Sequence, residues 1–392
     1  MPNIGAYVVD RLRGQRSAHA LSAVRELAVA HDVAGVVLTR PGAVAWASGG
    51  MNPPVDRTAA TDVVWLCVGP DRAIIVTTEV EAPRIIAEMD PAAYGIEVVA
   101  VPWWDGAAPV TASKRALGAA AGSTGGAPVL GSDGHVGFEV DLTDAITAAR
   151  LALCPAELVE LRALGCDAAE AVQNALRAWV PGESDRQIQG RIADLVEASG
   201  ADCPVLLVGA DERVGRFRHP VAIGAPAYRI VMAVLVARRS GIHVALTRYA
   251  SAGALDPQLA DGLSATRRIH RKVLAACVPG ATYGSVLDVL DLAYVDEGHP
   301  GAWQQHYQGG PIGYAQREFE IAPVQHDSPW WNHPIASGTA VAWNPSLPGG
   351  SKDEDTYLVS PDGVAQAVTV APDWPTADDQ SPERPGVLTV GG

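Results

Sequence analysis

The chain has 392 residues, with 44 Asp and Glu against 29 Lys and Arg, so its formal net charge is −15. Hydrophobic residues make up 48% and charged residues 19% of the chain, which is enough to fill a folded core and too apolar for a disordered protein. The acidic balance argues against nucleic-acid partners and against anionic membrane surfaces, since both are recognised by basic patches. At roughly 150 residues per domain, the length predicts about two or three domains.

The first 150 residues alternate helical and strand patterns, as expected of an α/β domain. Apolar residues at helical spacing predict helices at 17–31 and 80–89. Short apolar runs predict strands at 35–38, 63–68, 73–76, 98–101 and near 129–130. The turn Gly69-Pro70-Asp71-Arg72 predicts a hairpin, and the Gly/Ala-rich stretch 119–127 predicts a surface loop.

A second unit starts near residue 151, where a helix at 155–179 is predicted to begin with Pro155 in its first turn. The later elements follow as helix 185–199, strands 205–208, 230–237 and 243–246, helices 263–277 and 285–297, and strands 339–343 and 356–359. Residues 371–392 are rich in Pro, Asp and Gly, so we expect a poorly ordered tail. The predicted domains are therefore 1–150 and 151–370, followed by the tail 371–392.

The sequence shows no signal for export or for crossing a membrane. Its longest strongly apolar run, 230–237, has 8 residues, whereas about 20 are needed to span hydrocarbon. The first residues lack the basic region and apolar stretch of a signal peptide. Five scattered cysteines without a C-x-x-C pair are neither a disulfide framework nor a zinc site. We therefore expect a cytoplasmic protein with reduced cysteines.

The common nucleotide-binding and hydrolase motifs are absent. The chain has neither a G-x-G-x-x-G after a strand nor a G-x-x-x-x-G-K-[ST] loop, so a phosphate-cradling site has no support. The sequences H-E-x-x-H and G-x-S-x-G are missing as well. The chemistry must come from residues that are dispersed along the chain.

Four clusters in the second unit combine polar side chains with turn-forming residues. They are Arg216-Phe217-Arg218-His219-Pro220, Arg238-Arg239-Ser240-Gly241 followed by Thr247-Arg248, His306-Tyr307-Gln308-Gly309-Gly310 followed by Arg317-Glu318, and Asn344-Pro345 followed by Lys352-Asp353-Glu354-Asp355-Thr356. Imidazoles and carboxylates beside glycine turns suit proton transfer, because glycine lets a substrate approach the backbone closely.

The order of these clusters resembles the creatinase/aminopeptidase P superfamily, whose catalytic domain has the pita-bread fold. The segment 155–162 looks like the opening helix of that domain, and Val278-Pro279-Gly280-Ala281-Thr282 resembles one of its helix junctions. Leu38-Thr39-Arg40 with Trp46-Ala47-Ser48-Gly49-Gly50 is similar to the strand pair that opens the creatinase-type N-terminal domain. The resemblance implies an α/β (α+β) chain with a creatinase-type N-terminal α/β domain, a pita-bread C-terminal domain and a homodimer.

The sequence departs from the family at the metal ligands. Metal-dependent members bind two divalent ions through two Asp, one His and two Glu. The second Asp position is Ala245 here, the first falls within 234–238 where no acid occurs, and the first Glu is replaced by Asn344. Only His306 and Glu354 match. Because hard cations need several oxygen donors, we predict no metal site and no cofactor.

Creatinase, which the resemblance includes, hydrolyses a C–N bond in a small guanidino acid without metal and uses an imidazole as acid and base. His219 matches the position of that catalytic histidine. An unperturbed imidazole titrates near pH 6.5 and can shuttle protons. We therefore expect His219 and His306 to share proton transfer, with Glu354 and Glu318 as the acids that orient them. Glu320 is an equal candidate for the inward acid.

The other candidates are expected to bind substrate. Arginines can hold a carboxylate through two hydrogen bonds, and a tryptophan pair can line an apolar pocket. The predicted substrate-binding residues are Arg216, Arg218, Arg248, Tyr307, Arg317, Asn344, Trp330 and Trp331.

Together these residues predict a hydrolase that cleaves a C–N bond in a small carboxylate-bearing amide, amidine or modified amino acid. The same groups suit an elimination or an isomerisation, so a metal-free lyase or isomerase is an alternative. A second alternative is a pita-bread binding module without catalytic activity. An ordinary metalloaminopeptidase is disfavoured by Ala245 and Asn344.

Overall fold

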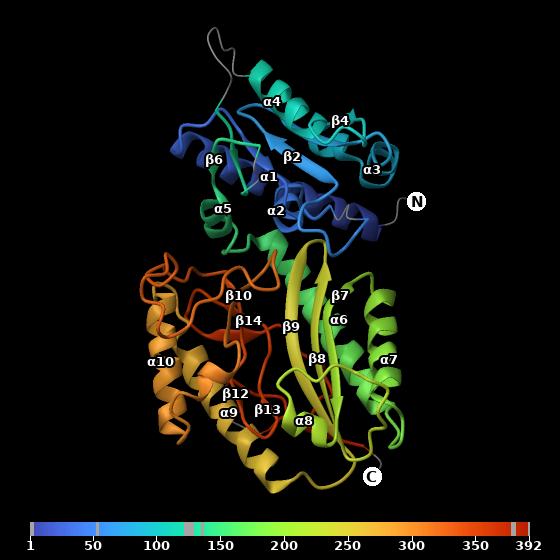
Figure 1. Cartoon of the computed structure of the whole chain (residues 1–392), viewed down its shortest axis with the longest axis vertical. Helices are drawn as coiled ribbons and strands as arrows, with labels where there is room; N and C mark the ends of the chain where they lie inside the picture. Colours follow the sequence, from blue (N-terminus) through green and yellow to red (C-terminus); the bar gives the residue numbers. More distant parts are fainter. Residues whose placement is uncertain (1–3, 52–54, 121–128, 135–136, 378–381, 391–392) are drawn as a thin grey trace. The chain divides into compact units, whose positions relative to one another are not determined.

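The computed structural model describes residues 4–51, 55–120, 129–134, 137–377 and 382–390 (Figure 1). The chain divides into two compact units. The first holds residues 1–150, 154–157 and 240–242, and the second holds residues 151–153, 158–239 and 243–392. Among the described residues, no helix is long and apolar enough to cross a membrane.

The first unit is built on a six-stranded sheet with the strand order β4-β3-β2-β1-β5-β6. Its strands are β1 (Val36–Leu38), β2 (Val64–Val68), β3 (Ala73–Thr78), β4 (Ile96–Val101), β5 (Gly131–Ser132) and β6 (Val140–Asp141). Its helices are α1 (Ile4–Ala30), α2 (Pro41–Ala47), α3 (Ala82–Met89), α4 (Ala108–Ala120) and α5 (Thr143–Ala149), with a short 3-10 helix at Pro91–Tyr94. Strands β2 and β3 are antiparallel, which confirms the predicted hairpin.

Three helices of the first unit were not predicted from the sequence. Helices α2, α4 and α5 consist largely of Ala, Gly, Thr and Pro, so their apolar spacing is weak. Their helical state depends on packing, of α4 on the sheet, of α2 on α1 and β2, and of α5 on α1. Strand β5 lies at 131–132 rather than at 129–130. The predicted loop 119–127 falls mostly outside the described residues, and its first two residues end α4.

The second unit contains two four-stranded sheets and a two-stranded ladder. The first sheet has the order β16-β9-β8-β7 and is formed by β7 (Asp202–Ala210), β8 (Ile230–Arg239), β9 (Ile242–Ser251) and β16 (Val387–Thr389). The second has the order β10-β11-β14-β15 and is formed by β10 (Gly309–Ile312), β11 (Ala340–Trp343), β14 (Tyr357–Val359) and β15 (Ala365–Ala367). The ladder joins β12 (Ser346–Leu347) to β13 (Ser351–Lys352).

The helices of the second unit are α6 (Pro155–Arg177), α7 (Asp185–Ala198), α8 (Glu212–Arg216), α9 (Pro257–Ala276) and α10 (Tyr283–Asp296), with a 3-10 helix η2 at Ala302–Gln305. Helix α9 begins six residues before its predicted start. The side chain of Asp256 accepts hydrogen bonds from the backbone N–H groups of Gln258 and Leu259, and Pro257 stands in the first turn, so this end is capped. Helices α9 and α10 pack on each other, and α7 packs on β7 (Figure 1).

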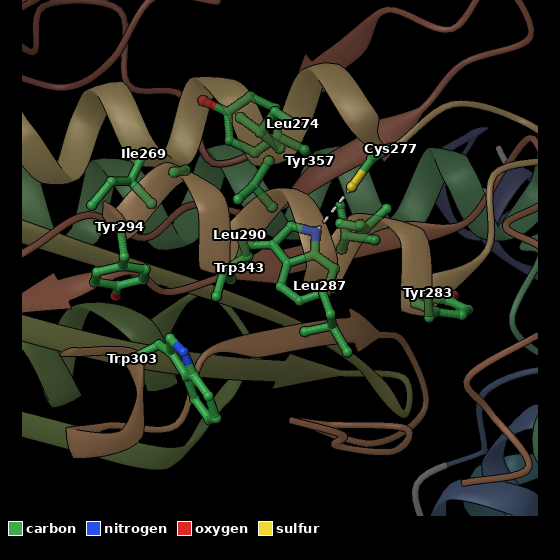
Figure 2. Close-up of a cluster of buried hydrophobic side chains, with 14 of the residues drawn as sticks. Ile269, Leu274, Cys277, Tyr283, Leu287, Leu290, Tyr294, Trp303, Trp343 and Tyr357 are labelled. Atoms are coloured by element: carbon green, nitrogen blue, oxygen red, sulfur yellow. Dashed lines mark hydrogen bonds between the residues drawn. The ribbon is translucent and has the colours of Figure 1, made fainter. Parts of the chain in front are cut away.

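An apolar core of the second unit lies between α9, α10 and the strands β11 and β14. Figure 2 shows Trp343 at its centre, with the indole N–H donating to the Sγ atom of Cys277 at 3.1 Å. Burial raises the pKa of the Cys277 thiol to about 12, so this cysteine stays a neutral, unreactive thiol. The hydroxyl of Tyr294 reaches the Gln308 side chain at 2.9 Å and thereby ties α10 to the segment before β10.

The C-terminal segment corrects one prediction. Residues 387–389 pair in parallel with residues 249–251 of β9, and the indole of Trp374 donates to the carbonyl of Gly386 at 3.1 Å. Arg384 is fully buried. The expected poorly ordered tail is therefore wrong for the described residues up to 390. Composition alone does not reveal that an arginine in a Pro-rich segment has buried carboxylates as partners elsewhere in the chain.

Candidate functional site

A cavity of about 410 Å³, called the main cavity below, lies on the face of strands β7, β8 and β9. Its apolar wall consists of Val205, Leu207, Val234, Val236 and Ala245. In the ladder Val205 lies opposite Val236 and Leu207 opposite Val234, so alternate residues of both strands face the cavity. The polar wall consists of His219, Tyr307, Gln316, Arg317, Glu320, Asn344, Lys352 and Glu354. An apolar wall with a few converging polar groups is typical of a small-molecule site.

The segment after β13 divides its side chains between two environments. Lys352 and Glu354 line the main cavity, whereas Asp353 and Asp355 bind the buried Arg384. This alternation is the period-2 pattern of an extended backbone. The carboxylate of Glu354 accepts a hydrogen bond from the hydroxyl of Thr247 at 2.8 Å, which holds it in place.

The other side of this segment forms a buried ionic cluster, which consists of Arg248, His270, Asp353, Asp355 and Arg384. Arg384 donates to both carboxylate oxygens of Asp353 at 2.8 Å, and His270 lies 3.1 Å from the same carboxylate. Arg248 donates to Asp355 at 2.8 Å. Burial disfavours the charged form of Asp353, but the positive charge of Arg384 keeps the pKa of this acid below its ordinary value. The cluster fixes the segment that carries Lys352 and Glu354.

His219 and His306 form a pair next to the main cavity. Their Nε2 atoms are 3.1 Å apart, and their ring centroids are 4.8 Å apart. Burial and the positive charge of Lys352 lower both pKa values, that of His306 to about 2. Both rings are therefore neutral near pH 7, and one Nε2–H donates to the other Nε2. The structure thus brings together the two histidines that the sequence analysis selected.

His306 also lines a second cavity of about 610 Å³, called the side cavity below. This cavity is lined by Trp303, Gln304, Gln305, His306, Tyr307, Gln308, Glu320, Ile321, Ala322 and Gln325. Tyr307 and Glu320 line both cavities. Tyr307 is 68% exposed, and its ring lies nearly parallel to that of His219, with centroids 6.3 Å apart. The imidazole pair therefore connects the two cavities.

Arg317 and Glu320 bring opposite charges to the main cavity. The Arg317 guanidinium donates to the carbonyl of Ala342 at 3.0 Å, close to Gly309. Gly309 has a φ of +93°, and a Cβ there would meet the Ala342 carbonyl oxygen at 2.2 Å, so only glycine fits. Burial raises the pKa of Glu320, against the opposing effect of Arg317. Of the two acids weighed from the sequence, Glu320 lines the cavity, and Glu318 accepts a hydrogen bond from the Ala315 N–H at 3.1 Å.

Three of the four predicted arginines point elsewhere. Arg248 belongs to the buried ionic cluster, where it also donates to the carbonyl of Thr369 at 2.8 Å. Arg218 donates to the carbonyl of Leu347 and to the Gln305 side chain. Arg216 is exposed at the end of α8, over the ring of Phe217. None of these three is among the residues that line the main or the side cavity in the described chain.

The predicted tryptophans pack against the core instead of the cavities. Trp330 stacks on Phe319 with ring centroids 4.2 Å apart. Trp331 covers the start of α10, where a Cβ on Gly284 would meet its indole at 2.4 Å. Neither tryptophan is among the described residues that line the main cavity or the side cavity. Arg317, Tyr307 and Asn344 are the predicted substrate-binding residues that do face the main cavity.

Sequence reasoning did not select Lys352 and Gln316 or the apolar wall. The sequence did contain a pattern that indicates Lys352. It stands two residues before Glu354, and residues two apart in an extended segment lie on the same side of the backbone. Lys352 is buried at 3% exposure, and its Nζ has no hydrogen-bond partner among the described residues. The same is true of Asn344 Oδ1. Burial lowers the pKa of Lys352, assisted by Arg218 and Arg317 and opposed by Glu354.

Solved structures share this architecture. Dipeptidase PepE from Mycobacterium ulcerans superposes with a TM-score of 0.73 at 20% identity and covers 96% of this chain and 99% of its own. The prolidase from Pyrococcus horikoshii OT3 gives a TM-score of 0.69 at 16% identity, covering 90% of this chain and 98% of its own. The chain has the pita-bread fold. The predicted fold class and the resemblance are thereby confirmed at the level of the fold.

A third structure with the same pita-bread fold is the N-terminal domain of the FACT complex subunit SPT16 from Cicer arietinum. It gives a TM-score of 0.63 at 12% identity, covering 92% of this chain and 96% of its own. No family model and no curated protein matches the sequence. Within the described part of the chain, no group of three or more His, Cys, Asp and Glu side chains is arranged to hold a metal ion.

Proposed function

We propose that the main cavity hydrolyses a C–N bond in a small carboxylate-bearing amide, amidine or modified amino acid, and that it does so without a metal ion. The observation that carries the proposal is the His219–His306 pair, with Nε2 atoms 3.1 Å apart beside a cavity of about 410 Å³. The similarity in fold to a dipeptidase and a prolidase, whose names describe enzymes that cleave C–N bonds, supports the reaction class.

In this proposal the imidazole of His219 takes up and releases the proton, and His306 holds the His219 ring in position. His219 lines the main cavity and donates its Nε2–H to His306, whose pKa of about 2 keeps it a neutral acceptor. The Nδ1 atom of His219 then takes a proton from water as the hydroxyl adds to the carbon of the C–N bond. The same proton passes to the leaving nitrogen, so that histidine ends the cycle neutral. Glu354 lines the same cavity as His219.

Substrate binding falls to Arg317, Asn344 and Tyr307, which all line the main cavity. The Arg317 guanidinium supplies a positive charge and planar donors for a carboxylate. The Oδ1 atom of Asn344 is buried without a partner among the described residues, and it suits an N–H group of the substrate. The apolar wall of valines, leucine and alanine excludes water around the rest of the molecule.

The chemistry of the donor set supports the metal-free part of the proposal. Among the positions that the resemblance assigns to metal-binding acids, the first falls within 234–238 where no acid occurs, the second is Ala245 and the third is Asn344. Glu354 lines the cavity. A dinuclear centre needs several carboxylates to offset the dehydration of two dications. The residues present do not fit such a centre, because Glu354 alone remains among the acids at those positions and the guanidinium of Arg317 lines the same cavity.

The test is release of primary amine or ammonia from a panel of N-acyl amino acids, amidino acids and dipeptides, with chelator present. His219→Ala is expected to lose at least about a hundredfold in kcat/KM, and His306→Ala is expected to lose activity as well. His299→Ala, an exposed histidine after α10, is the matched control and should keep full activity. Full activity in both variants would overturn the acid–base assignment.

Elemental mass spectrometry of the purified protein tests the metal-free part on its own. Less than about a tenth of an ion per chain, before and after incubation with manganese, cobalt, iron and zinc, is expected from the donor set. One or two tightly bound ions per chain, with activity lost in chelator, would restore the metallopeptidase alternative.

A binding module without catalysis is the second candidate, and the fold shared with a subunit of the FACT complex is the observation that favours it. The candidate predicts that no member of the panel is turned over. It also predicts that both histidine variants keep their ligand-induced rise in Tm, because a ligand that binds only the folded state stabilises it. The homodimer and the cytoplasmic location remain proposals, and sedimentation analysis of the purified chain tests the dimer.

A further inference from the structure

Lys352 differs from the other lysines of the chain. The sequence contains 29 Lys and Arg residues, of which only Lys114, Lys272 and Lys352 are lysines. Lys114 and Lys272 are partly exposed and form ion pairs with Glu139 at 2.8 Å and with Asp296 at 2.9 Å. Lys352 is 3% exposed, lines the main cavity and has no hydrogen-bond partner for Nζ among the described residues. A buried amine without a partner is costly, which points to a function for it.

The surroundings of Lys352 favour a reactive amine. The main cavity that Lys352 lines also has an apolar wall, with Val234 and Val236 on β8 and Ala245 on β9. Two guanidinium groups, those of Arg218 and Arg317, lie close enough to disfavour its protonation, and Glu354 opposes them. A lysine that is desolvated in an apolar pocket next to other cationic groups is the arrangement that makes an amine nucleophilic.

We propose that the Nζ atom of Lys352 forms an imine with the carbonyl carbon of a small aldehyde or 2-oxo acid bound in the main cavity. A carboxylate on that ligand has Arg317 on the same wall, and the His219–His306 pair can move the protons that imine formation requires. This inference concerns an activity beyond the proposed hydrolysis, and it does not depend on that hydrolysis.

The step balances with the groups present. The Nζ lone pair adds to the carbonyl carbon, the C=O electrons move to oxygen, and a proton passes from nitrogen to that oxygen to give a carbinolamine. The nitrogen lone pair then forms the C=N bond as the hydroxyl leaves with one proton as water. His219 takes up the proton released by nitrogen and returns it to the leaving hydroxyl. One amine and one carbonyl therefore give one imine and one water, with no oxidant or reductant.

The experiment uses the wild-type chain, glyoxylate as the probe and cyanoborohydride to reduce any imine to a stable secondary amine. Peptide mass mapping then follows the carboxymethyl adduct at each of the three lysines over time. Modification of Lys352 several-fold faster than that of Lys114 and Lys272 supports the proposal. Equal or slower modification of Lys352 overturns it, and this comparison needs no variant to fold.

Two variants sharpen the result. Lys352→Arg keeps a positive charge but removes the amine, so it should lose the fast adduct, whereas Lys114→Arg should keep it. Addition of acetate, which has a carboxylate and no carbonyl carbon that forms an imine, should slow the wild-type reaction if Arg317 holds the probe. The labelling reads the amine directly, so a chain that hydrolyses nothing can still give the adduct, and an active hydrolase can fail to give it.

Discussion

The buried ionic cluster makes a quantitative prediction about the C-terminal segment. Replacing Arg384 by methionine removes the guanidinium that donates to both oxygens of Asp353 at 2.8 Å and to Asp355 at 3.3 Å. Asp355 keeps Arg248 and the Thr369 hydroxyl as donors, whereas Asp353 keeps only the neutral His270 among its side-chain partners given above. The substitution thus leaves one buried carboxylate without a positive partner.

The magnitude follows from burial. Arg384 is 0% and Asp353 4% exposed, so solvent cannot replace the lost partner. Breaking such a buried pair from one side costs about 3–5 kcal/mol, since the remaining charge is uncompensated. The matched control is Arg268→Met, which removes a similar paired hydrogen bond to Glu297 but from an arginine that is 51% exposed. An exposed pair of this kind contributes about 0–1 kcal/mol.

Urea denaturation followed by peptide-resolved hydrogen exchange is the assay, because exchange in β9 and α9 reports on the second unit alone. Arg384→Met should lower the free energy of unfolding there by about 3–5 kcal/mol, and Arg268→Met by less than about 1 kcal/mol. A loss below about 1 kcal/mol for Arg384→Met would refute the inference that the C-terminal segment is an integral part of the second unit.

Three further predictions concern protonation and packing. The His306 imidazole, with a pKa of about 2, should show no titration of its NMR ring resonances between about pH 8 and pH 5, and a midpoint near the ordinary value of about 6.5 would contradict its burial. The pKa of Asp353 is below its ordinary value of 3.8, so its ion pairs should stabilise the fold at neutral pH and lose this stabilisation only as the pH falls below about 4; acid unfolding midpoints that are the same in wild type and in Asp353→Asn would show otherwise. Gly284→Ala places a Cβ 2.4 Å from the Trp331 indole and should cost about 1–3 kcal/mol by urea denaturation. Gly190→Ala in α7, where a Cβ meets nothing within 4 Å, should be neutral or stabilise by up to about 1 kcal/mol, and equal effects of the two changes would argue against the Trp331 contact.

Local patterns in the sequence determined most of the elements, whereas the pita-bread fold was implied by the resemblance to the family. Apolar runs such as 230–237 predicted buried strands correctly, because a strand covered by other elements reads as a continuous hydrophobic stretch. Helix-start residues placed α6 and α7 within a residue or two of their observed ends. The Ala- and Gly-rich helices of the first unit were not predicted, because their helical state depends on packing rather than on a periodic apolar pattern.

The direction in which charged side chains point was decided only by the tertiary structure. Arg248 and Glu354 both come from clusters that the sequence singled out, yet Arg248 turns to Asp355 and Glu354 turns to the main cavity. A buried charge goes where a partner compensates it, and such partners are often a hundred or more residues away, as Arg248 and Asp355 are. The Pro-rich composition of the C-terminal segment therefore predicted a tail. The ion pairs of Arg384 with Asp353 and Asp355 make this segment part of the fold.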